Sequence, residues 1–169
     1  MLNEVADSSI LAIENFKKNA DAAALDRAVK MLADANSIHV IGYRQASWIA
    51  ACLFDGLVQL GCRCHRIEEP ANVAQRVVSA LGADDLLLAV CLSDDDDSAV
   101  RVAKAAQAGQ VPVLAFAHRA DHPLAGASNL FVAMPASPES RFEPRAAHMM
   151  FAQALLLALE KRRAGRTAC

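Results

Sequence analysis

The sequence predicts a three-layer α/β fold in which helices cover both faces of a five-stranded parallel sheet. Short apolar runs alternate with segments of helical periodicity, and short connections join them. The run over 85–92 is apolar at every position after its first residue, which is typical of a central parallel strand covered on both faces. Glycine or proline stands at the ends of several segments. These observations favour strands joined by right-handed crossovers.

The chain opens with two predicted helices, over 2–20 and 22–34, whose apolar residues recur at three- and four-residue spacing. Asp21 fits the N-cap of the second helix, because its carboxylate can accept the unpaired N–H groups of the first turn. The first strand is expected over 37–41, and Gly42 ends it.

A helix, a strand and a second helix are expected next. The first of these helices covers 46–60 and stops at Gly61, a favourable residue beyond a helix C-terminus. A strand over 62–67 has only weak alternation. The helix over 71–81 follows Pro70, and proline is favourable at a first helical turn.

The second half of the chain begins with the central strand. A helix over 97–108 follows it, then strands over 111–117 and 129–134, and a long apolar helix over 145–163. Five such strands favour the flavodoxin-like order 2-1-3-4-5, which makes the first and third strands neighbours where the order reverses. Ligands bind outside the carboxyl ends of the strands at that point. The turns after these two strands should therefore face one pocket.

Length, charge and cysteine content restrict the function classes. The 169 residues fit one domain, with N-terminal helices over 1–35, an α/β core over 36–134 and a loop with the C-terminal helix over 135–163. The net charge of -2 gives no general reason to expect nucleic-acid binding. The five cysteines form no CxxC pair, so neither disulfides nor zinc are expected and a reducing cytoplasm fits. We expect no signal peptide, and no apolar run approaches the ~20 residues of a membrane span.

Two turns carry the candidate ligand-binding residues. The first is Gly42-Tyr43-Arg44-Gln45-Ala46-Ser47, where glycine permits close backbone approach and Arg44 can hold a phosphate as a bidentate donor. The second covers 91–98, at the start of a helix whose N–H groups favour an anion. The predicted ligand-binding residues are Gly42, Arg44, Ser47, Ser93, Asp94, Asp96, Ser98 and His118.

The second turn contains four consecutive aspartates, for which three interpretations are open. They are the solvated start of a helix, where acids gain from the helix dipole although they repel one another. Alternatively, Asp94, Asp95, Asp96 and Asp97 hold a divalent cation, or they recognise a cationic ligand. We expect no cofactor. A phosphate dianion here would need compensation by Arg44 or by the pair His118-Arg119.

Several stretches across the chain carry a family resemblance. They are Ala28-Val29, Ala35-Asn36-Ser37-Ile38, Val40-Ile41-Gly42, Leu60-Gly61, Asp85-Leu-Leu-Leu-Ala-Val-Cys-Leu-Ser93, Val111-Pro-Val-Leu-Ala115 and Pro123-Leu124-Ala125. Together they resemble a sugar isomerase (SIS) domain over about residues 25–160, most closely the ligand-sensing half of RpiR/MurR-type transcriptional regulators. The resemblance implies non-catalytic binding of a phosphosugar or another carbohydrate derivative.

The two loops depart from the family pattern. The first loop usually reads Gly-x-Gly-x-Ser and here has Arg44 at the second glycine. The second loop usually reads Ser-x-Ser-Gly-x-Thr, and here only Ser93 is retained. The chain begins at what resembles the linker helix, so we expect no helix-turn-helix module, no direct nucleic-acid contact and no membrane contact.

Two alternative functions stay open. One is an aldose-ketose sugar-phosphate isomerase, because Phe142-Glu143 resembles a step in hexulose-phosphate isomerases; Glu143 would be the base. His148 is a second catalytic candidate, although it also fits a core histidine. The other alternative is a degenerate SIS domain that serves only in oligomerisation. Apolar helix faces at both ends of the chain, and the resemblance itself, imply a homodimer or homotetramer.

Overall fold

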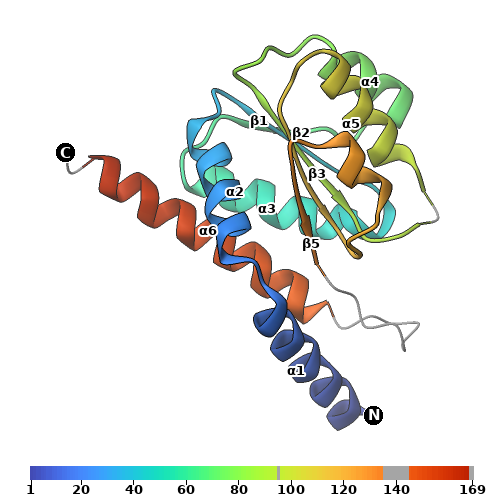
Figure 1. Cartoon of the computed structure of the whole chain (residues 1–169), viewed down its shortest axis with the longest axis vertical. Coiled ribbons are helices and arrows are strands. Elements are labelled where there is room, and N and C mark those ends of the chain that lie inside the picture. Colours follow the sequence, from blue (N-terminus) through green and yellow to red (C-terminus); the bar gives the residue numbers. More distant parts are fainter. Residues whose placement is uncertain (95, 135–144, 168–169) are drawn as a thin grey trace.

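The five predicted strands form one parallel sheet in the predicted order. The computed structural model describes residues 1–94, 96–134 and 145–167. Its strands are β1 (Ile38–Gly42), β2 (Cys64–Arg66), β3 (Leu86–Cys91), β4 (Val113–Ala117) and β5 (Leu130–Ala133). They lie in the order β2-β1-β3-β4-β5, and every neighbouring pair is parallel. Figure 1 shows the sheet within the whole chain. The predicted fold class and strand order are confirmed.

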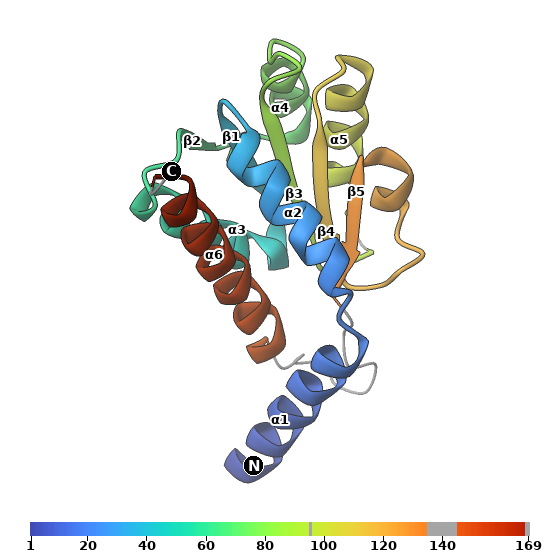
Figure 2. The ribbon, with the colours of Figure 1, turned by 60° about the vertical axis from the view of Figure 1, so that its left-hand side comes forward.

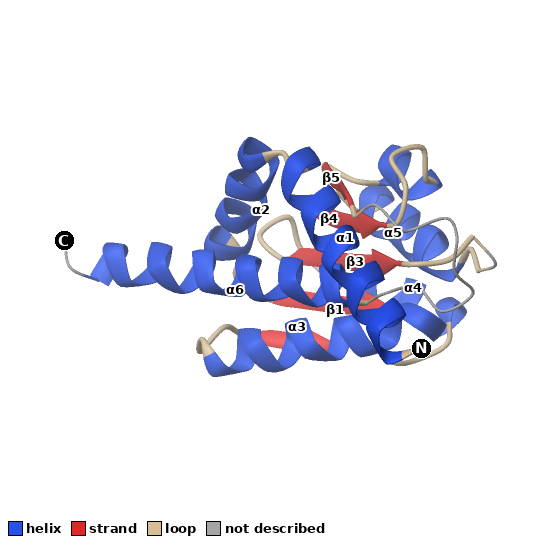
Figure 3. Cartoon of the chain, turned by 90° about the horizontal axis from the view of Figure 1, so that it is seen from below, coloured by secondary structure: helices blue, strands red, loops and turns tan. Residues whose placement is uncertain are grey.

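Helices cover both faces of this sheet. They are α1 (Leu2–Asn19), α2 (Ala22–Asp34), α3 (Ser47–Gln59), α4 (Ala71–Val78), α5 (Ser98–Ala108) and α6 (Ala146–Thr167), with short 3-10 turns η1 (Arg44–Ala46) and η2 (Pro123–Ala127). Residues of α2, α3 and α6 share one core with the sheet, and residues of α4, α5 and η2 share the other. Figure 3 shows the strands between these two helical layers.

The two faces of the sheet carry side chains of different size. In β3 all six residues are buried; Leu86, Leu88 and Val90 face α2, α3 and α6, whereas Leu87, Ala89 and Cys91 face α4 and α5. This alternation follows from the pleat of a strand.

Within the described part of the chain, helix α1 packs against the core through residues of its C-terminal half. Phe16 is buried edge-on against Phe151 of α6 at 5.5 Å, and Phe151 in turn meets Phe116 of β4 at 4.9 Å. The N-terminal half of α1 projects from the body (Figure 2) and leaves Leu2 83% exposed and Val5 62% exposed. The apolar helix face expected at this end of the chain is therefore exposed.

Local patterns predict most element boundaries. Asp21 caps α2 as predicted, since its carboxylate accepts the N–H groups of Ala23 and Ala24 at 2.9 and 3.1 Å. Helix α6 continues to Thr167, four residues past the predicted end. None of the helices in the described ranges combines the length and apolar character needed to cross a membrane.

Gly42 ends β1 where η1 folds back over the strand. A Cβ atom at this position would lie 2.7 Å from the carbonyl oxygen of Ala46 and 2.7 Å from the Cβ of Ala50. The sequence suggests that this glycine admits a ligand. The close approach in the structure is that of the chain's own helix, so Gly42 sets how tightly α3 packs on β1.

We therefore expect Gly42→Ala to lower the free energy of unfolding by about 1–3 kcal/mol, because overpacking against backbone forces a shift of η1. Denaturant unfolding measures this change. Gly126→Ala is the matched control, since a Cβ at Gly126 meets nothing within 4 Å; it should change stability by less than about 0.5 kcal/mol. Equal effects of the two substitutions would contradict this account of Gly42.

Candidate functional site

The turns after β1 and β3 lie side by side, as the strand order requires. Gly42 is paired with Val90 in the sheet register, so both strands end at the same edge. Tyr43, Arg44, Ser93 and Asp96 line the hollow between the turns. Its volume is about 10 Å³, which is room for about one water. The described side chains thus meet at the expected place without enclosing a sugar-sized cavity.

Arg44 occupies an unusual position in the first turn. Its φ of 50° puts it in the left-handed region, which is uncommon for a residue other than glycine. Its carbonyl accepts the Ser47 hydroxyl at 2.8 Å. The guanidinium is exposed, and within the described part of the chain it makes no hydrogen bond or ion pair. Arg44 thus combines a left-handed backbone with an exposed cation at the carboxyl edge of the sheet, and such backbone outliers cluster at functional sites.

Asp96 and Asp97 are part of the start of α5. Asp96 accepts the N–H of Ser98 at 2.9 Å. Its hydrogen bonds with Ser98, followed by the positive charges of Arg44 and Arg101, lower the pKa of Asp96, although burial opposes the shift. Asp97 pairs with Arg101 one turn later at 3.1 Å. For these two aspartates the geometry favours the helix-start interpretation; Asp95 lies outside the described residues.

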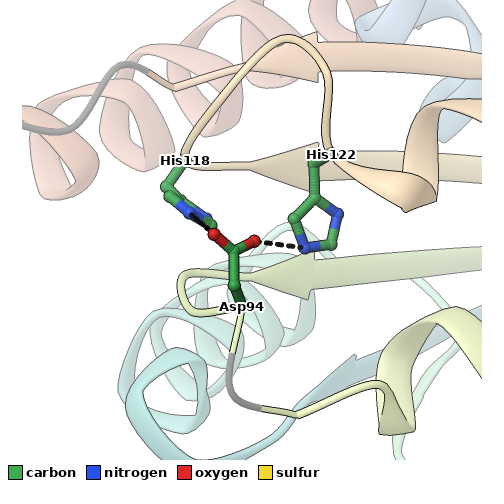
Figure 4. Close-up of side chains that lie close together, drawn as sticks. All are labelled: Asp94, His118 and His122. Atoms are coloured by element: carbon green, nitrogen blue, oxygen red, sulfur yellow. Dashed lines mark ion pairs between the residues drawn. The ribbon is translucent and has the colours of Figure 1, made fainter.

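Asp94 has a different environment, because it faces the loop after β4. Its carboxylate lies 3.4 Å from Nε2 of His118 and 3.8 Å from Nε2 of His122 (Figure 4). The carboxylate also lies 3.0 Å from Nε of Arg119. Arg119 also pairs with Asp121 at 2.7 Å. Burial raises the pKa of Asp94, but the hydrogen bond of Arg119 and the charge of His118 outweigh it, so the net pKa lies below its usual value.

The tautomer of His122 follows from its second ring nitrogen. His122 is only 3% exposed, and its Nδ1 accepts the N–H of Leu124 at 3.1 Å, which caps η2. The proton of the neutral ring is therefore on Nε2, the atom that faces Asp94. Burial, followed by the charge of His118, lowers the pKa of His122, while Asp94 and the backbone of Ser93 raise it.

Asp94, His118 and His122 bring possible metal ligands within 4.8 Å of one another. A metal at Nε2 of His122 would need the ring proton on Nδ1, where it would oppose the N–H of Leu124. The donor set consequently fits an anion better than a cation. Asp94, Asp96 and Asp97 turn to three different partners, so these three aspartates do not converge on one point.

The sequence did not single out His122. A histidine before proline in a loop has no periodicity and no motif, so nothing local marks it. The strand order contains the missing signal, because β3 and β4 are neighbours and their ends meet. Residues following Cys91 and Ala117, the last pair of this ladder, must lie close together.

One of the two catalytic candidates lies within the described part of the chain. Glu143 lies outside the described residues. His148 is 2% exposed at the start of α6, and neither ring nitrogen makes a well-formed hydrogen bond with the described residues. Burial, then the charges of Arg145 and His118, lower its pKa. Burial also raises the pKa of the Cys91 thiol, which disfavours a nucleophilic thiolate.

A much larger hollow lies at the opposite edge of the sheet. Its volume is about 460 Å³, and it is lined by residues before β1 and β2, including Asn36, Cys62 and Arg63, together with Arg163 of α6. At this edge a guanidinium nitrogen of Arg163 lies 2.8 Å from the sulfur of Cys62. Helices α2 and α3 end there, and arginines suit helix C-termini.

Comparison with known proteins identifies the family. Residues 31–158 match the family model of the SIS domain. The chain belongs to the SIS domain family. A comparison with curated proteins gives no match.

Solved structures of SIS proteins share the fold. The sugar isomerase domain of an RpiR transcription factor from Sphaerobacter thermophilus has a TM-score of 0.91 at 19% identity, covering 98% of this chain and 93% of that one. NanR of Vibrio vulnificus complexed with ManNAc-6P has a TM-score of 0.84 at 22% identity, covering 99% and 67%. Phosphoheptose isomerase GmhA from Neisseria gonorrhoeae has a TM-score of 0.78 at 16% identity, covering 94% and 99%. The fold is thus shared by regulators and isomerases.

The burial of His148 predicts a pH-dependent stability. Its folded pKa lies below the unfolded value of about 6.5. The stability that it contributes is therefore fully present above pH ~6.5 and is lost as the pH falls toward the folded pKa, because the unfolded chain takes up the proton.

We expect His148→Met to reduce the loss of unfolding free energy between pH 7.5 and pH 5.5 by up to about 1.4 kcal/mol per pH unit below the unfolded pKa. Denaturant unfolding over this range measures it. At pH 8 the histidine is neutral in both states, so the comparison there isolates the change in packing. A pH profile identical to that of the unsubstituted protein would show that His148 takes up its proton without unfolding.

Proposed function

We propose that this SIS domain binds a phosphosugar or a related carbohydrate derivative without converting it, as a sensor domain of the RpiR type. The observation that carries the proposal is Arg44, whose exposed guanidinium pairs with none of the described residues and whose left-handed backbone lies at the edge where the strand order reverses. Ser47 and Ser93 flank it. The fold similarity to an RpiR regulator, and to a NanR protein complexed with ManNAc-6P, supports the same class of ligand.

A ligand screen tests the proposal. ManNAc-6P, arabinose 5-phosphate and their unphosphorylated sugars would be added to the whole chain in a thermal-shift experiment. A ligand at about 100 times its dissociation constant adds ~2.7 kcal/mol, a rise in Tm of roughly 5–10 °C for a chain of this size. A rise with phosphorylated sugars alone supports the proposal; no rise with any sugar contradicts it.

We expect Arg44→Gln to weaken the binding of the sugar phosphate by about tenfold, because a charged hydrogen bond is worth ~1.5–3 kcal/mol and 1.4 kcal/mol is a factor of ten. Isothermal titration gives the dissociation constants. Arg63→Gln removes an exposed arginine from the opposite edge of the sheet and is the matched control. An equal loss in both variants would indicate general charge attraction and no specific role for Arg44.

A catalytic role is the second candidate, favoured by the neutral, buried imidazole of His148 and by the fold shared with phosphoheptose isomerase. In that case Glu143→Gln would abolish an aldose-ketose conversion that the unsubstituted chain performs, since the base that moves the proton between carbons is lost. Turnover of arabinose 5-phosphate and ManNAc-6P, followed by NMR, measures it. Undiminished turnover in the variant would exclude Glu143 as the base.

The assembly and place of action complete the proposal. We take residues 1–169 as one SIS domain that acts in the cytoplasm as a homodimer or homotetramer. The exposed apolar side chains of α1, such as Leu2 and Val5, support self-association. Sedimentation over a range of concentrations tests this, and a monomer at every concentration would contradict it. A chain that self-associates but binds no sugar would instead be a domain for oligomerisation only.

A further inference from the structure

The loop after β4 turns three side-chain nitrogen atoms toward one point at the carboxyl edge of the sheet. Nε of Arg119 and Nε2 of His118 and His122 all face the carboxylate of Asp94, at 3.0, 3.4 and 3.8 Å. The proton of the neutral His122 ring is on Nε2, because Nδ1 accepts the N–H of Leu124. This N–H bonds the backbone of Ser93 and lies 3.8 Å from Asp94, so it acts on the carboxylate as a nearby dipole and not through a hydrogen bond. A cluster of donors around one carboxylate has the chemistry of an anion site.

We propose that Arg119, His118 and His122 form an anion site for the ligand's phosphate, and that the carboxylate of Asp94 occupies this site as an internal competitor. The inference rests on the proposed function for the identity of the ligand. It adds where the phosphate binds, and it reverses the role of Asp94, which the sequence presented as a ligand-binding residue. Binding then exchanges one anion for another at the same donors.

Accessibility and charge support the exchange. The side chain of Asp94 is 52% exposed, so the site opens to solvent on the side of the β3–α5 turn. His122 is buried and His118 is largely buried, so these two rings are held in place before a ligand arrives, whereas the more exposed Arg119 is held by Asp94 and Asp121. A phosphate dianion carries more charge than a carboxylate and therefore interacts more strongly with Arg119. Asp94 competes because it is tethered, at high effective concentration.

The loop supplies a matched pair of aspartates for the test. Asp97 stands three residues from Asp94 on the same turn, with the same charge, and pairs with Arg101 outside the donor cluster. Asp94→Ala empties the site, and Asp97→Ala removes the same charge from the same turn without touching the donor cluster. Asp94→Asn keeps the shape of the side chain and serves if the alanine variant does not fold.

Inorganic phosphate, ManNAc-6P and ManNAc would be titrated into the whole chain and the variants by calorimetry. We expect Asp94→Ala to bind phosphate and ManNAc-6P at least tenfold more tightly than the unsubstituted chain. Asp97→Ala should stay within about twofold. Adding Arg119→Gln to Asp94→Ala should remove the gain. Tighter binding of phosphate and ManNAc-6P but not of ManNAc assigns the phosphate group to this site.

Other outcomes overturn the proposal. If both alanine variants bound phosphate more tightly by the same factor, the effect would be general charge repulsion and not competition by Asp94. If Asp94→Ala bound ManNAc-6P more weakly, Asp94 would be a ligand contact. Stabilisation by Zn²⁺ that Asp94→Ala abolishes would identify a metal site instead. If the unsubstituted chain binds ManNAc-6P and Asp94→Ala leaves its affinity unchanged, this inference fails while the proposed function stands. If no variant binds a phosphorylated sugar, both fail.

Discussion

The parallel pairing of β1 with β3 is the contact on which the rest of the structure depends. Five residue pairs, from Ile38 with Leu86 to Gly42 with Val90, join the two strands. The chain leaves β1 toward α3 on one face and leaves β3 toward α5 on the other. Because the following helices diverge, the turns that open them stay uncovered at one edge. A slip of this register by one residue would turn every side chain of the slipped strand to the other face of the sheet.

Charge at this edge is distributed between two neighbouring loops. The turn after β3 is acidic, and its aspartates are balanced by arginines that come later in the chain, Arg101 on α5 and Arg119 after β4. The usual SIS loop uses hydroxyl groups and backbone N–H groups at this turn, and hydroxyls need no counter-charge. Here Asp94 and Asp97 stand at this turn, and each carboxylate is paired with an arginine, Arg119 or Arg101.

The elements and the strand order could be predicted from the sequence because both follow from local patterns: the apolar run of β3, the cap at Asp21 and the alternation of strands with helices. The sequence offered the pair His118-Arg119 as compensation at the acidic turn, but it did not show that Asp94 is the aspartate they meet, since no periodicity relates two loops. The contact of Gly42 with Ala46 and Ala50 could not be predicted either, because a glycine in the sequence does not show which atoms lie near it. Contacts between loops need the register as well as the order.

The position of the larger hollow raises the question of which edge suits an anion. Volume alone favours the amino edge, where about 460 Å³ is open. In a parallel α/β sheet, however, α3 and α5 begin at the carboxyl edge and α2 and α3 end at the amino edge. The helix dipoles thus make the carboxyl edge positive and the amino edge negative. Arg63 and Arg163 offset negative helix ends, whereas Arg44 adds to a positive one. The field of the fold therefore favours an anion at the carboxyl edge of the sheet, although the hollow there is the smaller one.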